Sequence, residues 1–165
     1  MTPIALIVHN IRSTYNVGSF MRSSDCFGIS KIYFSGYTPY PARTKDTRLA
    51  HIAQKLTTQI AKTALGAEKT VPFSVYSTVK SAIEAAQKDG YIIAVLEQDQ
   101  SSIPLTTHVF CDPTAIVLGN EVLGADAWTK RTADVILEIT QYGTKESLNV
   151  ASATAIALFA ARLKT

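Results

Sequence analysis

Residues 115–126 read Ala-Ile-Val-Leu-Gly-Asn-Glu-Val-Leu-Gly-Ala-Asp. The first four residues are an apolar run that predicts a short buried strand, and this run ends directly at Gly119. A second glycine, Gly124, follows five residues later. Glycine at the end of a strand lets the backbone approach a ligand closely. The stretch therefore predicts a strand that opens into a binding turn, in which Glu121 is either a binding acid or an ordinary surface residue.

Strand-like and helix-like segments alternate on both sides of this stretch. Apolar, β-branched runs predict further strands at residues 4–8, 31–34, 91–96 and 135–139. Helical spacing predicts helices at residues 17–27, 51–65, 78–88 and 147–163, of which the last is largely buried. Asn16 is the expected N-cap of the first helix, and Gly28 ends it. This alternation predicts a single α/β domain over residues 1–165 with a mainly parallel sheet.

Composition excludes several classes of protein. A hydrophobic fraction of 47% and a mean hydropathy of +0.12 are typical of a globular domain and too high for a disordered chain. No apolar run approaches the roughly 20 residues of a membrane span, and the first residues have no basic segment typical of a signal peptide. We therefore expect a cytoplasmic protein. The two cysteines form no CxxC pair and the three histidines are scattered, so no zinc or other metal site is expected.

Positive charge is concentrated in one segment. The net charge is only +3, but residues 43–69 hold six basic residues against two acidic ones. The basic residues are Arg43, Lys45, Arg48, Lys55, Lys62 and Lys69. Such a cluster fits a polyanion partner, and it equally fits a solvated helix face.

Two further loops carry polar residues at predicted strand ends, where ligands bind in open α/β sheets. After the first strand, Asn16 precedes Arg22 by six residues at the start of a helix. A helix N-terminus suits an anion, although an N-cap and a surface arginine would explain this pair as well. After the last strand, Ser147 and Asn149 open an otherwise apolar helix, and a capping role explains only one of them.

Together and in this order, the three loops resemble the signature motifs of the SpoU (TrmH-type) family of the SPOUT superfamily. The matching motifs are N-x5-R in the first loop, LGNEVLGAD in the second and SLNVASATAIALF in the third, and the resemblance covers residues 4–163. It implies a parallel α/β sheet whose C-terminal segment forms a trefoil knot. It also implies a homodimer that transfers a methyl group from S-adenosyl-L-methionine to a ribose 2′-hydroxyl of tRNA or rRNA.

The same resemblance implies roles for particular residues. The catalytic set is Asn16, Arg22, Glu121, Ser147 and Asn149. The cofactor contacts are Leu96, Gly119, Ile139 and Leu148, although the family's Ile-Pro-Met after the last strand is replaced here by Ile-Thr-Gln. Because an arginine pKa exceeds about 12, we expect Arg22 to bind the target phosphate or hydroxyl rather than to act as a base. We expect no separate RNA-binding domain, so the expected RNA contacts are Arg12, Arg43, Lys45, Arg48, Lys55 and Lys62.

Three alternatives stay open from the sequence. One is a SPOUT enzyme that methylates a base, against which the SLNV motif argues. Another is a non-catalytic RNA-binding or assembly factor with the same fold, which would not need all five catalytic residues. The third, a Rossmann oxidoreductase, lacks its GxGxxG fingerprint, and the GxxxxGK[ST] pattern of a P-loop is also missing.

Overall fold

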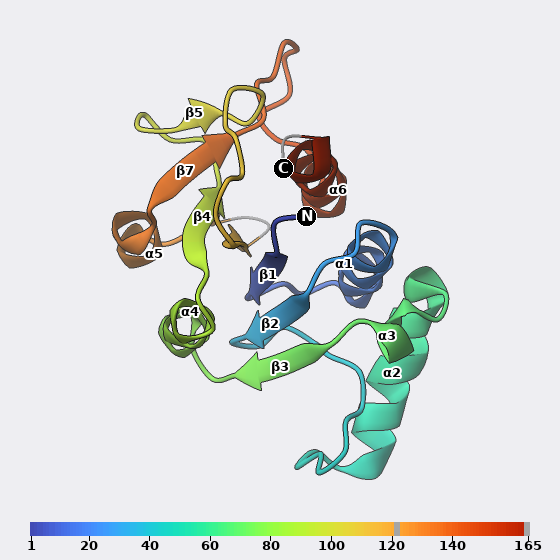
Figure 1. The fold of residues 1–165 in the computed structure, drawn as a ribbon. Coiled ribbons are helices and arrows are strands. Elements are labelled where there is room, and N and C mark those ends of the chain that lie inside the picture. Colours follow the sequence, from blue (N-terminus) through green and yellow to red (C-terminus); the bar gives the residue numbers. More distant parts are fainter. Residues whose placement is uncertain (121–122, 164–165) are drawn as a thin grey trace.

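The computed structural model of the protein describes residues 1–120 and 123–163 (Figure 1). In these ranges, seven parallel strands form one sheet in the order β3-β2-β1-β6-β4-β7-β5. Their bounds are β1 Ile4–His9, β2 Lys31–Ser35, β3 Phe73–Tyr76, β4 Ile92–Leu96, β5 Ile103–Pro104, β6 Thr114–Leu118 and β7 Val135–Glu138. The expected parallel α/β architecture is confirmed.

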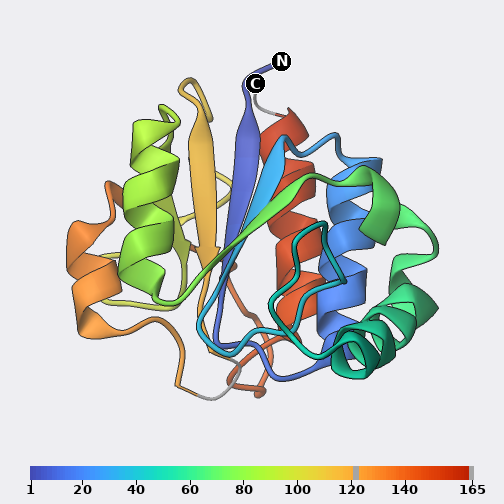
Figure 2. The same ribbon diagram turned by 90° about the horizontal axis from the view of Figure 1, so that it is seen from below.

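Helices cover both faces of the sheet (Figure 2). Their bounds are α1 Thr14–Cys26, α2 Ala50–Ala64, α3 Ala67–Thr70, α4 Val79–Lys88, α5 Ala127–Thr132 and α6 Val150–Leu163. Helices α4 and α5 lie on one face, whereas α1 and α6 lie on the other, with α2 and α3 packed outside α1 (Figures 1 and 2). Side chains of β1 alternate between the two cores: Leu6 and Val8 join the α1/α6 side, and Ala5 and Ile7 join the α4 side.

The predicted strands occur within one residue of their expected bounds, but two strands and two short helices were not predicted. Strand β5 has only two residues, one of them a proline, and β3 is a four-residue strand with only half-buried side chains. The helices α3 and α5 have four and six residues, which is too short for a helical period to be recognised. The trefoil knot implied by the family resemblance stays a prediction.

The expected starts of two helices were wrong. Helix α1 begins at Thr14 rather than Val17, and its N-cap is Ser13, whose hydroxyl accepts a hydrogen bond from the Asn16 N–H at 3.3 Å. Helix α6 begins at Val150 rather than Ser147, because Asn149 takes the capping role: its Oδ1 accepts from the Ala151 N–H at 2.8 Å. Both side chains that the motifs single out therefore lie at a helix start.

Helix α6 is also less buried than expected. Ala157, Leu158 and Ala161 are fully buried, but Phe159 is 51% exposed and Ile156 and Leu163 are also exposed. The helix thus has one face in the core and one apolar face outside it. No helix in the described ranges is both long and apolar enough to span a bilayer.

Close packing of α1 against α2 fixes the position of the first motif. A Cβ on Gly18 would lie 2.1 Å from Thr63 Oγ1 and 2.3 Å from the carbonyl oxygen of Ile60. The same Thr63 hydroxyl donates to the Tyr15 carbonyl at 2.8 Å. Only glycine at this position lets the two helices approach so closely.

We expect Gly18→Ala to lower the free energy of unfolding by about 1–2 kcal/mol. The added methyl group forces the helix pair apart, and because it meets a backbone oxygen the cost lies in the upper half of the usual range, about 2–3 kcal/mol. The better helix propensity of alanine recovers about 1 kcal/mol of this. Urea unfolding measures the difference. Gly143→Ala, with open space around its Cβ, is the control, and an unchanged G18A protein would contradict the packing argument.

Candidate active site

A cleft of about 650 Å³, here cleft A, opens beyond the carboxyl ends of β4, β6 and β7. Parallel strands all end at this edge of the sheet, so loops that are distant in sequence meet here. The walls come from the start of α1, the turn after β6, the segment after β7 and the start of α6. The lining residues are Asn16, Leu96, Glu97, Gln98, Leu118, Gly119, Asn120, Gly124, Ile139, Gln141, Glu146, Ser147, Leu148, Asn149, Val150 and Ala153.

Cleft A brings together most of the residues singled out by the sequence. Seven of them line it: Asn16, Ser147 and Asn149 from the proposed catalytic set, and Leu96, Gly119, Ile139 and Leu148 from the proposed cofactor set. Arg22 does not line it, because it lies exposed further along α1. Glu121 lies outside the described residues.

The turn after β6 is closed by its own backbone. The N–H of Asn120 donates to the Gly124 carbonyl at 3.1 Å, and the N–H of Gly124 donates back to the Asn120 carbonyl at 2.9 Å. A Cβ on Gly119 would lie 2.4 Å from both Gly124 C and Ala125 N. Gly124 has φ +67°, a left-handed conformation that favours glycine. Both glycines of the motif are thus required by this turn.

Glu97 is a site residue that the sequence analysis missed. Its Oε2 accepts a hydrogen bond from the Ala125 N–H at 3.0 Å, and its Oε1 accepts from the Gln98 N–H at 3.1 Å. The carboxylate therefore holds the far end of the glycine turn. The available signal was its position directly after β4, at the edge of the sheet where ligands of parallel α/β folds bind.

The electrostatic character of cleft A follows from its side chains. Among its described lining residues there are two carboxylates, Glu97 and Glu146, and no lysine or arginine. Leucine and isoleucine side chains supply the apolar surface. This combination suits an amphipathic ligand that is neutral or positively charged rather than a polyanion.

Two titratable groups lie near this edge of the sheet, one at the carboxyl end of β1 and one at the N-cap of α5. Burial lowers the pKa of His9, whose Nδ1 lies 3.0 Å from Ser35 Oγ. The amide of Thr129 lowers the pKa of Asp126 by donating to its carboxylate, which caps α5. Neither side chain lines cleft A. The described part of the chain also contains no group of three or more His, Cys, Asp or Glu side chains placed to hold a metal ion.

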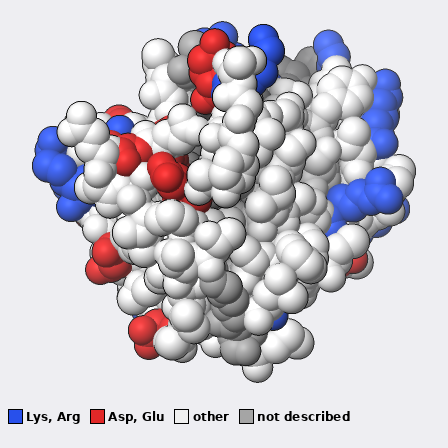
Figure 3. Space-filling model, turned by 90° about the horizontal axis from the view of Figure 1, so that it is seen from above, with Lys and Arg blue, Asp and Glu red and all other residues white. Residues whose placement is uncertain are grey.

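The basic residues expected to contact RNA fall into two groups. Arg12, Arg43, Lys45, Lys55 and Lys62 are exposed. Figure 3 shows lysine and arginine side chains along its right-hand edge, on the side where α2 and α3 lie in Figure 1. Few acidic side chains accompany the basic ones along this edge, whereas at the left and the top of the same face acidic side chains lie among the basic ones.

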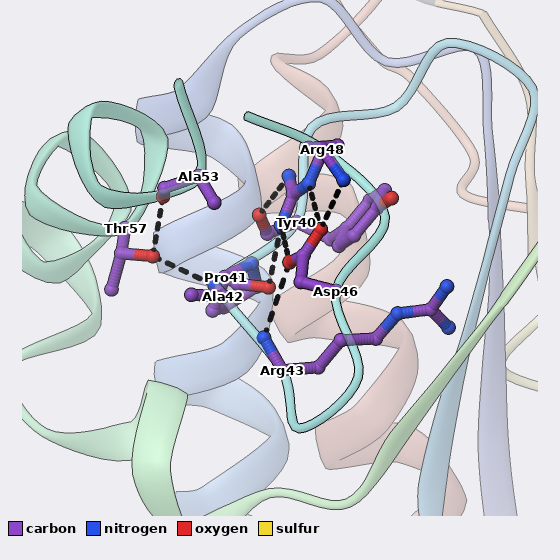
Figure 4. Close-up of polar contacts among 8 residues, drawn as sticks. All are labelled: Tyr40, Pro41, Ala42, Arg43, Asp46, Arg48, Ala53 and Thr57. Atoms are coloured by element: carbon purple, nitrogen blue, oxygen red, sulfur yellow. Dashed lines mark hydrogen bonds and ion pairs between the residues drawn. The ribbon is translucent and has the colours of Figure 1, made fainter. Parts of the chain in front are cut away.

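Arg48 belongs to a different group (Figure 4). Its guanidinium donates to the Asp46 carboxylate at 2.9 Å, to the Tyr40 carbonyl at 2.9 Å and to the Pro41 carbonyl at 3.1 Å. Hydrogen bonds from Arg48 hold the pKa of Asp46 well below its usual range. The carboxylate therefore stays ionised at mildly acidic pH, and the pair keeps the loop over residues 40–48 in shape. Much of the Arg48 charge is neutralised within this loop.

Comparison with known proteins agrees with this geometry. The sequence profile of the SpoU rRNA Methylase family matches residues 3–159. The chain belongs to this family. The resemblance seen in the sequence is therefore confirmed at the level of the family, and the roles of the residues in the motif loops stay predictions.

Individual members of the SpoU family align over nearly the whole chain. The 23S rRNA (guanosine-2′-O-)-methyltransferase RlmB of Ralstonia nicotianae is 27% identical over 159 residues, which is 96% of this chain and 58% of the relative. The corresponding RlmB of Coxiella burnetii is 28% identical over 160 residues, 94% of this chain and 56% of the relative. The chain thus spans less than two thirds of the length of these relatives.

Solved structures share the fold. An AdoMet-bound rRNA methyltransferase from Sinorhizobium meliloti superimposes with a TM-score of 0.81 at 23% identity, covering 98% of this chain and 56% of that one. The A. aeolicus TrmH/SpoU tRNA-modifying enzyme superimposes with a TM-score of 0.80 at 21% identity, covering 99% and 76%. The SpoU family fold therefore extends over the described chain.

Proposed function

We propose that this chain is an RNA methyltransferase that takes S-adenosyl-L-methionine as cofactor and methylates a ribose 2′-hydroxyl of tRNA or rRNA. The observation that carries the proposal is the convergence of three separate motif loops on cleft A. Membership of the SpoU family supports it, since relatives are named as 2′-O-methyltransferases and a structural neighbour was solved with AdoMet bound.

The residues of cleft A fit the cofactor. A volume of about 650 Å³ lies in the range of small-molecule sites. Leu96, Ile139 and Leu148 offer apolar walls for an adenine ring, and the glycine turn lets backbone groups reach the ring edge. The carboxylates of Glu97 and Glu146 favour a ligand with a positive charge. When bound, the cofactor supplies a methyl group activated by the positive sulfonium.

The remaining work for the protein is alignment and proton removal. Asn16, Ser147 and Asn149 supply polar groups on the walls of cleft A and would orient the reacting groups. Arg22, outside the cleft, would bind the target phosphate or hydroxyl and stabilise developing negative charge, because its guanidinium cannot serve as a base. The target phosphate would take up the proton of the 2′-hydroxyl. Glu121 completes the proposed catalytic set.

The experiment that tests this function combines binding with product analysis. Calorimetric titration with S-adenosyl-L-methionine should show saturable binding to the protein, and incubation with total tRNA and rRNA should yield a 2′-O-methylated nucleoside by mass spectrometry. A methylated base in place of a methylated ribose would identify the base-modifying alternative. Binding of RNA without any binding of the cofactor would identify a non-catalytic assembly factor.

A homodimer is part of the proposal. The outer face of α6 exposes Ile156, Phe159 and Leu163, and the middle of the face in Figure 3, over α6, shows neither sign of charge. Exposed apolar stripes of this kind mark interaction sites. A second copy of the chain would cover them, and sedimentation equilibrium measures the association. We also propose a cytoplasmic location, where tRNA and rRNA are found.

The basic edge on α2 would bind the RNA backbone. Lys55 and Lys62 are seven residues apart, so they lie on the same face of the helix. We expect Lys55→Glu/Lys62→Glu to weaken RNA binding. The slope of log affinity against log salt concentration should also become less steep, by about 0.9 for each phosphate that the protein no longer neutralises. Anisotropy titrations over a salt series measure both. An unchanged slope would show that this edge does not bind RNA. Lys80→Glu on α4 is the control and should leave the slope unchanged.

A further inference from the structure

A second cleft, cleft B, lies at the start of α1 and has a volume of about 640 Å³. Its walls are the first residues of α1, the segment 36–40 after β2, and α2. Three tyrosines and two arginines line it: Tyr15, Tyr37, Tyr40, Arg12 and Arg48. None of the three tyrosines has a role in the proposed methyl transfer.

Two of the tyrosine rings are available to a ligand. Tyr15 is 52% exposed and Tyr37 is 54% exposed. The ring of Tyr40, in contrast, carries the Arg48 guanidinium at 3.7 Å from its centroid. Cleft B therefore presents two open aromatic rings, Tyr15 and Tyr37, next to a third ring that the protein itself has covered.

A side-chain hydrogen bond links a residue of cleft A to a residue of cleft B. Asn120, which lines cleft A, donates from Nδ2 to the Tyr37 hydroxyl at 2.7 Å and to the Asn10 carbonyl at 2.9 Å. The Tyr37 N–H in turn donates to Asn10 Oδ1 at 3.2 Å. A ligand on the Tyr37 ring would thus lie directly beside the glycine turn that holds the proposed cofactor.

The charges of the two clefts are opposite. Among its described lining residues, cleft B contains the exposed Arg12 and no carboxylate, and its second arginine, Arg48, is largely neutralised by Asp46. Cleft A contains two carboxylates and no cationic side chain among its described lining residues. A polyanion would therefore enter cleft B. Arg22 would offer a further positive charge to a polyanion bound in cleft B. It lies seven residues after Tyr15 on α1, on the same face and about 10 Å along the helix.

Open aromatic rings beside arginines are the combination by which proteins bind unpaired nucleotides. Bases of a duplex are stacked on each other and cannot reach such rings, whereas splayed bases of single-stranded RNA stack on them. We propose that cleft B binds an unpaired nucleotide next to the methylated ribose, with its base on Tyr37 or Tyr15 and its phosphate near Arg12. The inference rests on the proposed function for the position of the ribose. It specifies the substrate further: the target lies in a single-stranded segment.

The test compares two RNA forms and two kinds of substitution. A short fluorescein-labelled oligouridylate and a duplex of the same length are titrated against the full chain by fluorescence anisotropy. We expect the single strand to bind more tightly, and Tyr37→Ala and Tyr15→Ala each to weaken it about tenfold, the usual effect of losing one stacking ring. Tyr37→Phe keeps the ring and should bind nearly as the unmodified protein does. Tyr142→Ala, an exposed tyrosine outside both clefts, is the matched control.

Several results would overturn the inference. They are equal binding of duplex and single strand, unchanged affinity in both alanine variants, or a loss in Tyr37→Phe as large as that in Tyr37→Ala. The last result would mean that the hydroxyl contact with Asn120, rather than the ring, determines binding. Calorimetry with S-adenosyl-L-methionine on the same preparations tests the proposed function separately, because failure to bind the cofactor would leave these RNA affinities unaffected.

Discussion

Arg22→Ala is expected to reduce methyl transfer by at least about a hundredfold while leaving the affinity for S-adenosyl-L-methionine within about twofold. Arg22 is exposed on α1 and lies outside the lining of cleft A, so its loss removes no proposed cofactor contact. Its proposed role is to stabilise charge that develops on the reacting oxygen, and removal of one such donor typically costs about a hundredfold to a thousandfold in rate. Single-turnover methylation at saturating cofactor, together with calorimetry, measures the two quantities.

A conservative variant and a distant arginine complete this experiment. Arg22→Lys keeps the charge but loses the planar donor geometry, so we expect an intermediate rate. Arg131→Ala removes an exposed arginine of α5, remote from α1, and should have the unmodified rate. Loss of cofactor affinity in step with activity would show that Arg22 acts on the cofactor and that its assigned role is wrong.

The sequence predicted the architecture because the central strands carry a strong local signal. Strand β6 is buried along its whole length, and its apolar run ends at a glycine. The edge strands β3 and β5 are half-buried or contain proline, so no comparable pattern marks them. The order of the strands could not be predicted either. Strand β1 pairs with β2 and with β6, and nothing local to residues 4–9 specifies the distant partner β6.

The candidate site was predictable to the same extent. Motif spacing identified residues from three loops, and the shared carboxyl edge of a parallel sheet brings them together. Motif spacing could not show that Arg22 lies outside cleft A, because its position depends on how α1 is oriented against the sheet and α2. Position after a strand marks Glu97 only as a residue near the site; its role comes from accepting a hydrogen bond from Ala125, 28 residues away in the chain, which motif spacing does not show.

Capping residues show a third limit. The expectation of a cap at Asn16 was wrong because Ser13 satisfies the same requirement three residues earlier. Serine and asparagine are nearly equal as N-caps, so composition alone does not decide between them. At α6 the same ambiguity was resolved in favour of Asn149, which leaves Ser147 in the preceding loop, on the wall of cleft A.

Gly119→Ala is expected to weaken binding of S-adenosyl-L-methionine by about 5- to 150-fold. The new Cβ would lie 2.4 Å from the backbone of Gly124 and Ala125, and neither atom belongs to a side chain that could rotate away. The turn over residues 119–125 must therefore open, which breaks the paired hydrogen bonds between Asn120 and Gly124. Overpacking of this kind costs about 1–3 kcal/mol, which corresponds to the stated range when it is expressed in binding.

Calorimetry at constant protein concentration measures this affinity, and thermal unfolding of the same samples shows whether the fold survives. Gly143→Ala has open space around its Cβ and should bind the cofactor as the unmodified protein does. Because the turn forms one wall of cleft A and Asn120 ties it to Tyr37, the G119A protein should also bind single-stranded RNA less tightly. Unchanged cofactor affinity in a folded G119A protein would show that the cofactor does not contact the glycine turn. The assignment of cleft A as the cofactor site would then be wrong.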